Sequence, residues 1–524
     1  MNPVRHDPKA NPVKDVQISN HSNVLMPYRV FAFTSFSMLV VITVYVWLIS
    51  FGSWIKWPAT SNYYDQLATA FEHRNLSIET KPSRALLALP DPYDPSARAG
   101  INYPKDFSLY NGKYYLYFGP VPALILVIVK SMGLNNLGDQ DIVFALVSGI
   151  FIFQSLLILK IWKRFFQKVP LWIILACILF SGLVSPFTWI LTQARVYEAA
   201  ASSGQFFFLA GFYFVITASE QKSATKKNRF LIAGILWALA IGSRLTQILP
   251  IGFVTLIIAF FTIRTYRQTK ELPKAILTME LLGGPLVLCL AVLARYNWAR
   301  FHSIFETGLS YQLAGSDLQK YSHVLFSPLY ILPNLYNYLV MTPRINMNFP
   351  FLESVPGIGP SMFSFITLPD IYFNNVLTGM LFSTPFVLFA GICITAFVLK
   401  KKNLMNLVSQ ADDLSLFKGL VAALAGSFVF GFVPFILFFW VASHYQTDFI
   451  PSLVILSIIG FWQGYIFTTH KPDIIRKLYV AIGIILMIAS IIISILLVLS
   501  AHADKFQKFN PILWEYLVRL FSRQ

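Results

Sequence analysis

Long apolar runs that recur along the whole chain constrain its fold more than any other feature. The run "VFAFTSFSMLVVITVYVWLISFG", residues 30–52, exceeds the roughly 20 apolar residues that an α-helix needs to cross a bilayer. Similar runs recur to the C-terminus, and only 12% of the 524 residues are charged. Because lipid leaves no partners for open backbone groups, these runs predict an all-α polytopic membrane protein. The first run is too long for a signal peptide and reads as a retained anchor.

The basic residues are grouped at the ends of the apolar runs. The net charge is +17, and the basic clusters fall at residues 160–168, 226–229, 264–270, 400–402 and 471–477. This is the positive-inside distribution, which sets the orientation of membrane proteins. No basic groove with interleaved aromatic residues accompanies it, so nucleic acid is not an expected partner.

The same rule predicts the topology of the N-terminal part. Residues 1–28 form a cytoplasmic tail, residues 29–52 the first span and residues 53–140 a large external loop. Within that loop residues 121–134 are apolar, but the stretch is short and contains Lys130. If this stretch were a span, every later basic cluster would lie on the external side of the membrane, which the positive-inside rule disfavours. The stretch therefore predicts an interfacial helix on the outer surface.

The rest of the chain then brings the total to about eleven spans. Residues 141–295 hold the second to seventh spans, residues 296–375 a second large external loop, residues 376–501 the eighth to eleventh spans, and residues 502–524 an amphipathic tail. The middle of the spans is nearly free of the ionisable residues that transporters usually need. Such residues fall instead near the outer ends: Arg195, Glu198, Arg244, Arg295, His444 and Asp448. This distribution indicates a site at the outer face.

Two other kinds of site are not indicated. The three cysteines, Cys177, Cys289 and Cys393, lie far apart inside apolar runs, as small buried hydrophobes do. The eight histidines lack the spacing of a zinc site, and no phosphate-binding loop motif occurs. Intrinsic zinc binding and nucleotide hydrolysis are therefore not expected.

Four stretches near the predicted outer face resemble a known family. "SNYYDQLATAFEHRNLSI" follows the first span, and "QARVYEAAASSGQFFFLAGFYFVI" leads into the fourth. "WALAIGSRLTQILP" forms a short turn between two spans, and "SHYQTDFIPSLVILS" leads into a late span. These stretches resemble the GT-C superfamily of membrane glycosyltransferases, related to the protein mannosyltransferases and the bacterial RgtA/B/C/D-like enzymes. Their order, their spacing and the side of the membrane on which they fall agree with that family over most of the chain.

The resemblance implies a GT-C-type helical bundle with two large external loops. It also implies transfer of a sugar from a polyprenyl-phosphate donor to a glycolipid, polysaccharide or protein acceptor. The site would face the outer, periplasmic side of a bacterial plasma (inner) membrane. No cofactor is certain, and a divalent cation stays open. The alternative function is a non-catalytic lipid or glycan translocase, or an envelope-assembly partner, but a translocase needs a polar path through the bundle that the sequence does not display.

The resemblance also suggests site residues. If Tyr64 is the tyrosine of the family's motif, the acidic pair would fall at Thr60 and Ser61, which are not acids, and Asp65 lies on the other side of the tyrosine. We take Asp65 and Asp94 as the candidate catalytic carboxylates. Carboxylates and aromatic rings of the segment "LPDPYDPSARAGINYPKDFSLYNGKYYLYFGP" would wall the sugar site beside Asp65. The candidate substrate-binding residues are Asp91, Tyr93, Asp106, Tyr114, Glu198, Arg244, Arg300 and His444.

Each candidate also has a structural interpretation. The aspartates of "DPYDP" favour turns, and Asp65 could be a solvated residue or a dipole partner of a helix N-terminus. Glu198 could pair with Arg195 one helical turn away, and Arg300 with Glu306. Arg244, placed by a tight turn near the outer leaflet, suits a donor phosphate because its planar fork binds phosphate oxygens bidentately. Its main alternative role is a structural ion pair with Glu198.

Overall fold

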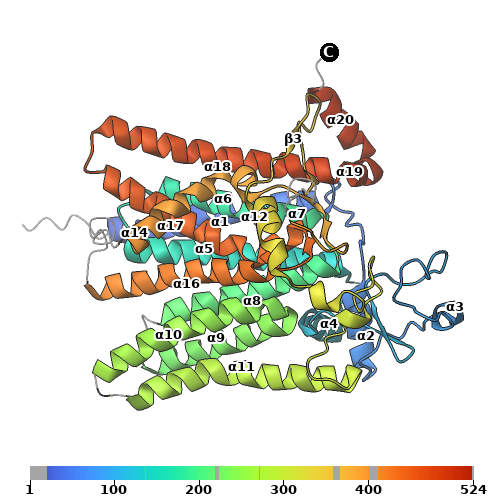
Figure 1. Cartoon of the computed structure of the whole chain (residues 1–524). Coiled ribbons are helices and arrows are strands. Elements are labelled where there is room, and N and C mark those ends of the chain that lie inside the picture. Colours follow the sequence, from blue (N-terminus) through green and yellow to red (C-terminus); the bar gives the residue numbers. More distant parts are fainter. Residues whose placement is uncertain are drawn as a thin grey trace, which may run out of the picture.

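Long helices lie side by side in a bundle, and most of the remaining chain gathers at one end of it (Figure 1). The computed structural model describes residues 21–135, 137–218, 223–268, 270, 272–357, 366–399 and 411–521. The bundle helices are α1 (His21–Ile49), α5 (Asp139–Phe165), α6 (Leu171–Leu183), α7 (Phe187–Thr192), α8 (Val196–Ala218), α9 (Ser223–Ser243), α10 (Ile248–Gln268), α11 (Leu272–Phe301), α14 (Ala390–Val398), α16 (Ala411–Ile436), α17 (Ile450–Thr468) and α18 (Asp473–Ala501).

The expectation of a mostly helical, multi-pass membrane protein is confirmed. Within the described residues, nine helices are long and apolar enough to cross a bilayer: Tyr28–Ile49, Asp139–Phe165, Leu171–Thr192, Val196–Ala218, Leu245–Arg264, Leu272–Phe301, Leu414–Ile436, Ile450–Thr468 and Asp473–Ala501. Each coincides with one of the predicted spans. Helix α9 is also a predicted span and packs along α8 and α11, but Lys226, Lys227 and Arg229 near its start set it apart from the nine.

The predicted eighth span, residues 376–399 at the start of the segment 376–501, is built differently. It begins with strand β7 (Val376–Leu377), which pairs with β5 (Val355–Pro356), and continues through α13 (Met380–Ser383) and η5 (Pro385–Phe389). Only the apolar helix Pro385–Val398 remains, which is shorter than the nine spans. Thr384, immediately before Pro385, has φ −143° and ψ 66°, which is not helical, and the proline ring disfavours a helical backbone at the residue before it. Apolar composition alone did not reveal this break.

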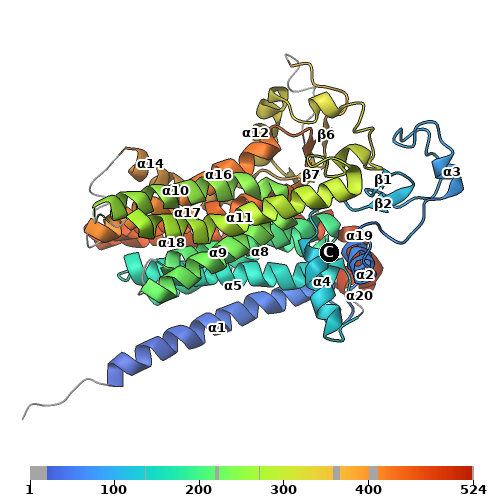
Figure 2. The same ribbon diagram turned by 90° about the horizontal axis from the view of Figure 1, so that it is seen from below.

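The first loop, residues 53–140, carries α2 (Tyr63–Glu72), α3 (Arg84–Leu87), the hairpin of β1 (Ser108–Tyr110) and β2 (Lys113–Tyr115), and α4 (Val121–Ser131). Helix α4 falls in the apolar stretch 121–134 and has 11 residues, about half of what a span needs. It packs against α2 and also contacts α8 and α9 at the end of the bundle (Figure 2).

The second loop follows α11 and contains short elements: η2 (Leu309–Tyr311), η3 (Ser322–Val324), η4 (Pro328–Tyr330), α12 (Ile331–Leu339), β3 (Arg344–Ile345), β4 (Leu352–Glu353), β5 and β6 (Phe373–Asn374). Between α16 and α17 the chain forms β8 (Trp440–Val441), which pairs with β6, and η6 (Ser443–Asp448). The C-terminal segment forms α19 (Ala503–Phe509) and α20 (Pro511–Phe521). Residues 522–524 of the predicted tail lie outside the described residues.

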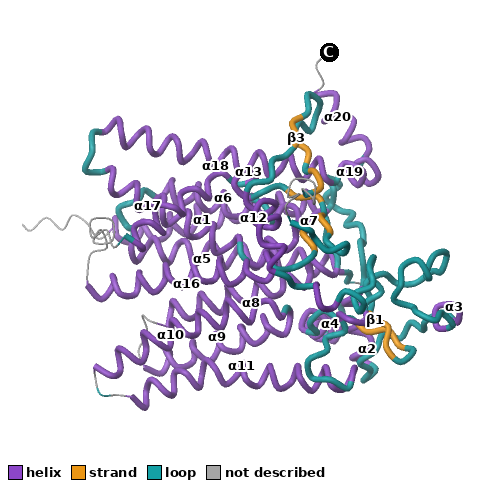
Figure 3. The backbone as a smooth tube through the Cα atoms, in the orientation of Figure 1, coloured by secondary structure: helices purple, strands orange, loops and turns teal. Residues whose placement is uncertain are grey.

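The two ends of the bundle differ in character. Both long loops, η1 (Leu245–Gln247), η6 and the C-terminal helices lie at one end, here called the loop end (Figure 3). The opposite end, here called the basic end, carries the end of α5, the starts of α9 and α18, and the end of α10, and with them the basic clusters around residues 160–168, 226–229, 264–270 and 471–477. The cluster 400–402 and the tail residues 1–20 lie outside the described residues.

Candidate functional site

A cavity of about 280 Å³ opens at the loop end, where α9, α11 and α16 end close together. Gly119, just before α4, permits this convergence: a Cβ atom there would lie 2.2 Å from the carbonyl oxygen of Gly242 at the end of α9. The described residues that line the cavity are Tyr117, Phe118, Gly119, Pro120, Tyr197, Ile241, Ser243, Arg244, Leu245, Thr246, Leu293, Tyr296, Asn297, Arg300, Thr307, Leu309, Phe326, Pro434, Phe435, Phe438 and Tyr445.

Arg244 connects the cavity wall to a buried carboxylate. It lies between α9 and η1, and its Nε donates to Oδ2 of Asp448 at 2.7 Å. Asp448 also accepts from Thr246 Oγ1 at 3.0 Å and from Gln247 Nε2 at 3.3 Å, so both of its oxygens are used. The side chains of Arg244 and Asp448 are 10% and 1% exposed. The partner of Arg244 is therefore Asp448, and the expected alternative pairing with Glu198 is wrong.

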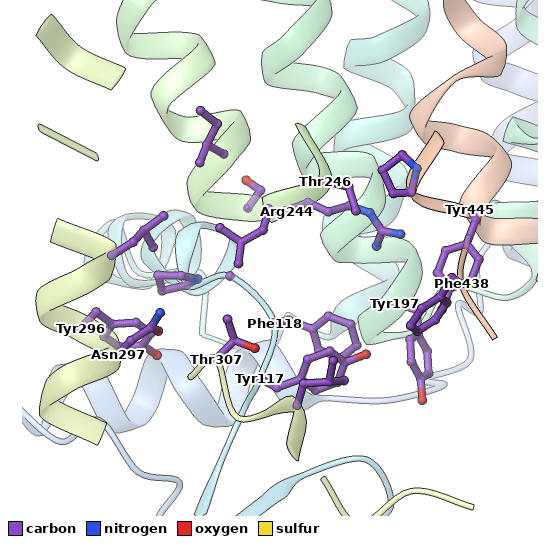
Figure 4. Close-up of a pocket in the computed structure, with 18 of the residues that line it drawn as sticks. Tyr117, Phe118, Tyr197, Arg244, Thr246, Tyr296, Asn297, Thr307, Phe438 and Tyr445 are labelled. Atoms are coloured by element: carbon purple, nitrogen blue, oxygen red, sulfur yellow. The ribbon is translucent and has the colours of Figure 1, made fainter. Parts of the chain in front are cut away.

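The rest of the Arg244 guanidinium faces aromatic rings. Its Cζ atom lies 5.5 Å from the ring centroid of Tyr445 and 5.7 Å from that of Phe435. Figure 4 shows the side chain extending toward Tyr445. Within the described part of the chain, its two Nη groups have no hydrogen-bond partner. The ion pair thus fixes the guanidinium and leaves donors directed at the cavity.

Arg300 is the second guanidinium in the cavity wall, and it is held differently. It is 3% exposed, donates to the carbonyl of Leu116 at 2.7 Å and to Oδ1 of Asn297 at 2.8 Å, and stacks 3.8 Å from the ring centroid of Tyr296. Glu306 accepts instead from the backbone N–H of Gly308, and no ion pair joins it to Arg300 among the described residues. Among the described residues, Arg300 therefore brings positive charge to the cavity without an ion-pair partner, and Glu306 acts on it only from a greater distance.

Asp106 lies behind the tyrosine wall of the cavity. One carboxylate oxygen accepts from the hydroxyl of Tyr197, which lines the cavity, and the other from Gln312 Nε2 at 3.2 Å. Its φ of +67° is in the left-handed region that non-glycine residues rarely adopt, which is a feature of functional positions. Burial raises the pKa of the Asp106 carboxyl, although the Tyr197 hydroxyl and Arg195 oppose the change.

Glu198 belongs to a second, adjacent cluster. It is 1% exposed, accepts from the backbone N–H of Arg195 at 3.2 Å, and lies 3.6 Å from the guanidinium of the same residue. Nδ1 of His444 is 3.8 Å away. Burial and the nearby charges of Arg244 and Arg195 hold the pKa of His444 well below its ordinary value, so the imidazole is neutral near pH 7. The expected contact between Glu198 and Arg195 is therefore present, and His444 joins it as a neutral neighbour.

The C-terminal segment also reaches this cluster. Nζ of Lys505 donates to the carbonyl of Thr192 at 3.0 Å and to Oε1 of Gln193 at 3.2 Å. Burial and the charge of Arg195 lower the pKa of Lys505 to about 8. This contact could not be predicted, because Lys505 and Thr192 are 313 residues apart in the sequence.

Asp65, a candidate catalytic acid, is engaged elsewhere. Its Oδ1 lies 2.6 Å from Nζ of Lys130 on α4, and it is not among the residues that line the cavity. The resemblance placed an acidic pair at Thr60 and Ser61, and in the structure another acid, Asp139, contacts Ser61. Asp139, at the start of α5, accepts from the Ser61 hydroxyl and from the backbone N–H groups of Tyr63 and Tyr64 at 3.1 and 3.2 Å. Asp139 thus caps the start of α2. In the sequence, only the two acids of "GDQD", residues 138–141, could have indicated this role.

The remaining candidates of the first loop stabilise the loop itself. Asp91 accepts from the backbone N–H of Tyr93 at 2.8 Å, and Asp94 accepts from that of Ser96 at 2.9 Å; both are turns of the kind that aspartate favours. The hydroxyl of Tyr93 donates to the carbonyl of Leu109, and Tyr114 is buried in the β1–β2 hairpin. The structure does not bring these four candidates to the cavity wall.

The described residues do not form a metal-binding group. No three His, Cys, Asp or Glu side chains among them come together as ligands. Asp106 accepts from Tyr197 and Gln312, and Glu198 lies against Arg195, so these carboxylates do not fit a divalent cation.

Fold and site together define a multi-pass helical membrane protein with a cationic, tyrosine-lined cavity at one end of its bundle. No protein-family model matches the sequence, and no curated protein matches it.

Three solved structures are similar to the chain. They are the apo oligosaccharyltransferase of Archaeoglobus fulgidus (12% identity, TM-score 0.45, 94% of this chain and 60% of that one), ArnT of Cupriavidus metallidurans bound to undecaprenyl phosphate (13%, 0.41, 96% and 79%), and the Pmt1–Pmt2 protein O-mannosyltransferase complex of S. cerevisiae bound to the sugar donor (10%, 0.46, 95% and 91%). All three are GT-C glycosyltransferases. The chain spans about 60% of the length of the archaeal enzyme. With TM-scores below 0.5, these likenesses do not decide what this chain does.

Proposed function

We propose that this protein is a membrane glycosyltransferase that moves a sugar from a polyprenyl-phosphate donor to an acceptor hydroxyl at the loop end. The observation that carries the proposal is the cavity itself. It places two buried guanidiniums, Arg244 and Arg300, among tyrosines, and the described lining includes no carboxylate. Such a cavity suits an anion that also carries an apolar part.

The phosphate of the donor would bind to Arg244. Asp448 holds this side chain through Nε only, so the Nη groups can donate to phosphate oxygens. Charge-assisted bonds of this kind are stronger than those between neutral groups. Arg300 adds positive charge from the opposite wall and, because backbone carbonyls hold it, it needs no rearrangement.

The polyprenyl chain would leave the cavity along the apolar face of α10. Leu245 lines the cavity next to Arg244 and is 43% exposed. Leu249 and Leu256 continue the same helix surface at 42% and 69% exposed. In a bilayer, exposed side chains of this kind contact lipid tails. The charged part of the cavity is thus continuous with a surface that suits an isoprenoid chain.

We propose Asp106 as the general base in place of Asp65 and Asp94, because its carboxylate accepts from Tyr197, which lines the cavity, whereas Asp65 pairs with Lys130 and Asp94 accepts from the backbone of its own turn. In the transfer step, the acceptor hydroxyl oxygen bonds to the anomeric carbon of the sugar and its proton passes to the Tyr197 oxygen, while the Tyr197 hydroxyl proton passes to Asp106. The bond between the anomeric carbon and the phosphate oxygen breaks, and the polyprenyl phosphate leaves with its electron pair, stabilised by Arg244. Tyr197 separates Asp106 from the cavity, so its hydroxyl would position the acceptor. Tyr117 and Tyr445 offer ring faces to the sugar.

The charge distribution supports an external site. The described basic clusters lie at the basic end, opposite the cavity, and the positive-inside rule places that end in the cytoplasm. The loop end would then face the periplasm or the exterior of a plasma membrane, where lipid-linked sugars and envelope acceptors meet.

Membranes containing the full chain, incubated with a panel of radiolabelled polyprenyl-phosphate sugars and an envelope extract, test the proposal. We expect label to pass from the lipid-soluble donor to an acceptor, and transfer to fall in Arg244→Ala. Arg295→Gln is a matched control, because Arg295 is exposed on α11 and does not line the cavity. Movement of intact donor across vesicles without cleavage of the sugar–phosphate bond would instead show a translocase.

A further inference from the structure

A second cavity, of about 550 Å³, lies at the basic end of the bundle. It is enclosed by α8, α9, α10 and α16, which run side by side in Figure 1, with single residues from α5 and α11. We propose that this cavity binds an anionic membrane phospholipid, with its phosphate at the mouth and an acyl chain inside. The proposal does not depend on the transferase function, because the first cavity is at the other end of the same helices.

The inside of this cavity is apolar. Phe212 of α8, Phe230 of α9, Val254 of α10 and Leu420 of α16 line it and are each at most 6% exposed. Protein interiors are close-packed, and an apolar cavity of this size is costly when it is empty and does not hold ordered water well. The volume is within the range of ligand pockets, about 300–1,000 Å³. An apolar ligand is therefore expected inside.

The mouth of the cavity is polar and positively charged. Lys226 at the start of α9 and Arg264 near the end of α10 both line it, with Ser415 and Thr262 as neutral partners. Nζ of Lys226 lies 5.7 Å from the ring centroid of Tyr266, which keeps the ammonium beside the opening. The described lining residues include no acid. Basic pockets between helices at this level of a membrane suit phospholipid phosphates.

The order of these features identifies the kind of ligand. Charge is at the mouth and the apolar surface is deeper, which is the order of a phospholipid standing with its headgroup at the interface. A soluble anion would gain nothing from the apolar interior, and a neutral phospholipid would gain little from the two cations. The observations therefore favour an anionic phospholipid over either.

Native mass spectrometry of the full chain in detergent tests the proposal, with dioleoyl phosphatidylglycerol and dioleoyl phosphatidylcholine as probes. We expect phosphatidylglycerol to bind more tightly, and the double variant Lys226→Gln, Arg264→Gln to bind it about tenfold more weakly, because charge-assisted contacts are lost. The matched control is Lys227→Gln, Arg267→Gln, which removes neighbouring charges that do not line the cavity. It should leave binding unchanged.

A third variant, Leu420→Trp, fills the cavity without a change of charge. It should also weaken phosphatidylglycerol binding, and it keeps the test valid if the charge variants fail to fold. Equal binding of the two lipids, equal effects of the two double variants, or normal binding in Leu420→Trp would overturn the proposal. Full competition by glycerol phosphate would show a headgroup site alone, and stronger competition by undecaprenyl phosphate would show a polyprenyl site. Either result would also overturn it.

Discussion

Asp448 binds Arg244 through one donor, the Nε group, and leaves both Nη groups available. Arg244 can therefore have two roles, binding of the donor phosphate and a structural ion pair, and mutations distinguish them. If Arg244 binds the donor phosphate, Arg244→Lys should retain the ion pair but lose bidentate donation, and the donor KM should rise about tenfold. Arg244→Ala should lose donor binding almost completely. Binding of radiolabelled polyprenyl-phosphate sugar to purified protein measures both variants.

The structural role of the same pair makes a different forecast. Removal of one partner leaves a buried charge unpaired, which costs about 3–5 kcal/mol in typical cases. Asp448→Ala should therefore lower the melting temperature, and Arg244→Ala with Asp448→Ala should be no worse than Asp448→Ala alone. Normal donor affinity in a folded Arg244→Ala or Arg244→Ala, Asp448→Ala protein would exclude the phosphate role.

Asp106 and Asp65 give a second comparison between residues. A general base typically contributes about 10²–10⁴ to the rate, so Asp106→Asn should lower turnover by at least two orders of magnitude with the fold intact. Asp65→Asn should have a small effect, because its carboxylate is paired with Lys130. Asp94→Asn is the matched control on the exposed turn. The reverse order, with a large loss in Asp65→Asn, would return the catalytic role to Asp65.

The pH dependence of turnover follows from the same assignment. A base acts when it is deprotonated, so activity must rise as pH increases through its pKa. Because burial raises the pKa of Asp106, the acidic limb of the profile should lie above that of an ordinary aspartate. Replacement of Gln312 by Leu removes a hydrogen bond to the carboxylate and should move the limb further upward. Turnover measured across pH in wild type and Gln312→Leu checks the direction of both shifts.

At the scale of elements, the position of α4 decides the topology. Single cysteines in a background without Cys177, Cys289 and Cys393 can report it. Ser83→Cys and Ser131→Cys, both exposed at the loop end, should react with an impermeant thiol reagent in intact cells. Gln167→Cys, exposed at the basic end, should react only after permeabilisation. If Ser131→Cys reacted only after permeabilisation, α4 would be a span and the proposed orientation of the later helices would be inverted.

Elements also show why the sequence predicted some features and not others. Each of the nine candidate spans is a long apolar run, and run length alone identifies such helices. The segment 376–399 has the same composition, but its start pairs with β5, a contact that depends on the folded second loop. Arg244 and Asp448 are 204 residues apart, and Asp106 and Tyr197 are 91 apart. The sequence predicted Arg244 and Asp448 near the outer ends of helices and Asp106 in the first external loop, but it could not pair Arg244 with Asp448 or Asp106 with Tyr197.

At the scale of the whole molecule, two proposed ligand sites share the same helices. Arg244 precedes α10 and Arg264 lies near its other end, about 20 residues or about 30 Å away along the helix. Sites this far apart, with no shared partners, usually contribute independently to stability. The loop-end cavity and the basic-end cavity should therefore respond to their own ligands without coupling.

A thermal-shift experiment on the full chain tests this independence. A ligand at about 100 times its Kd stabilises the state that binds it by about 2.7 kcal/mol, so undecaprenyl phosphate and phosphatidylglycerol should each raise the apparent melting temperature. Together their shifts should add. Arg244→Ala should lose only the first shift, and Lys226→Gln with Arg264→Gln only the second, because each substitution removes the charge at one end. Loss of both shifts in either variant, or a combined shift well below the sum, would mean that the two lipids compete for one site.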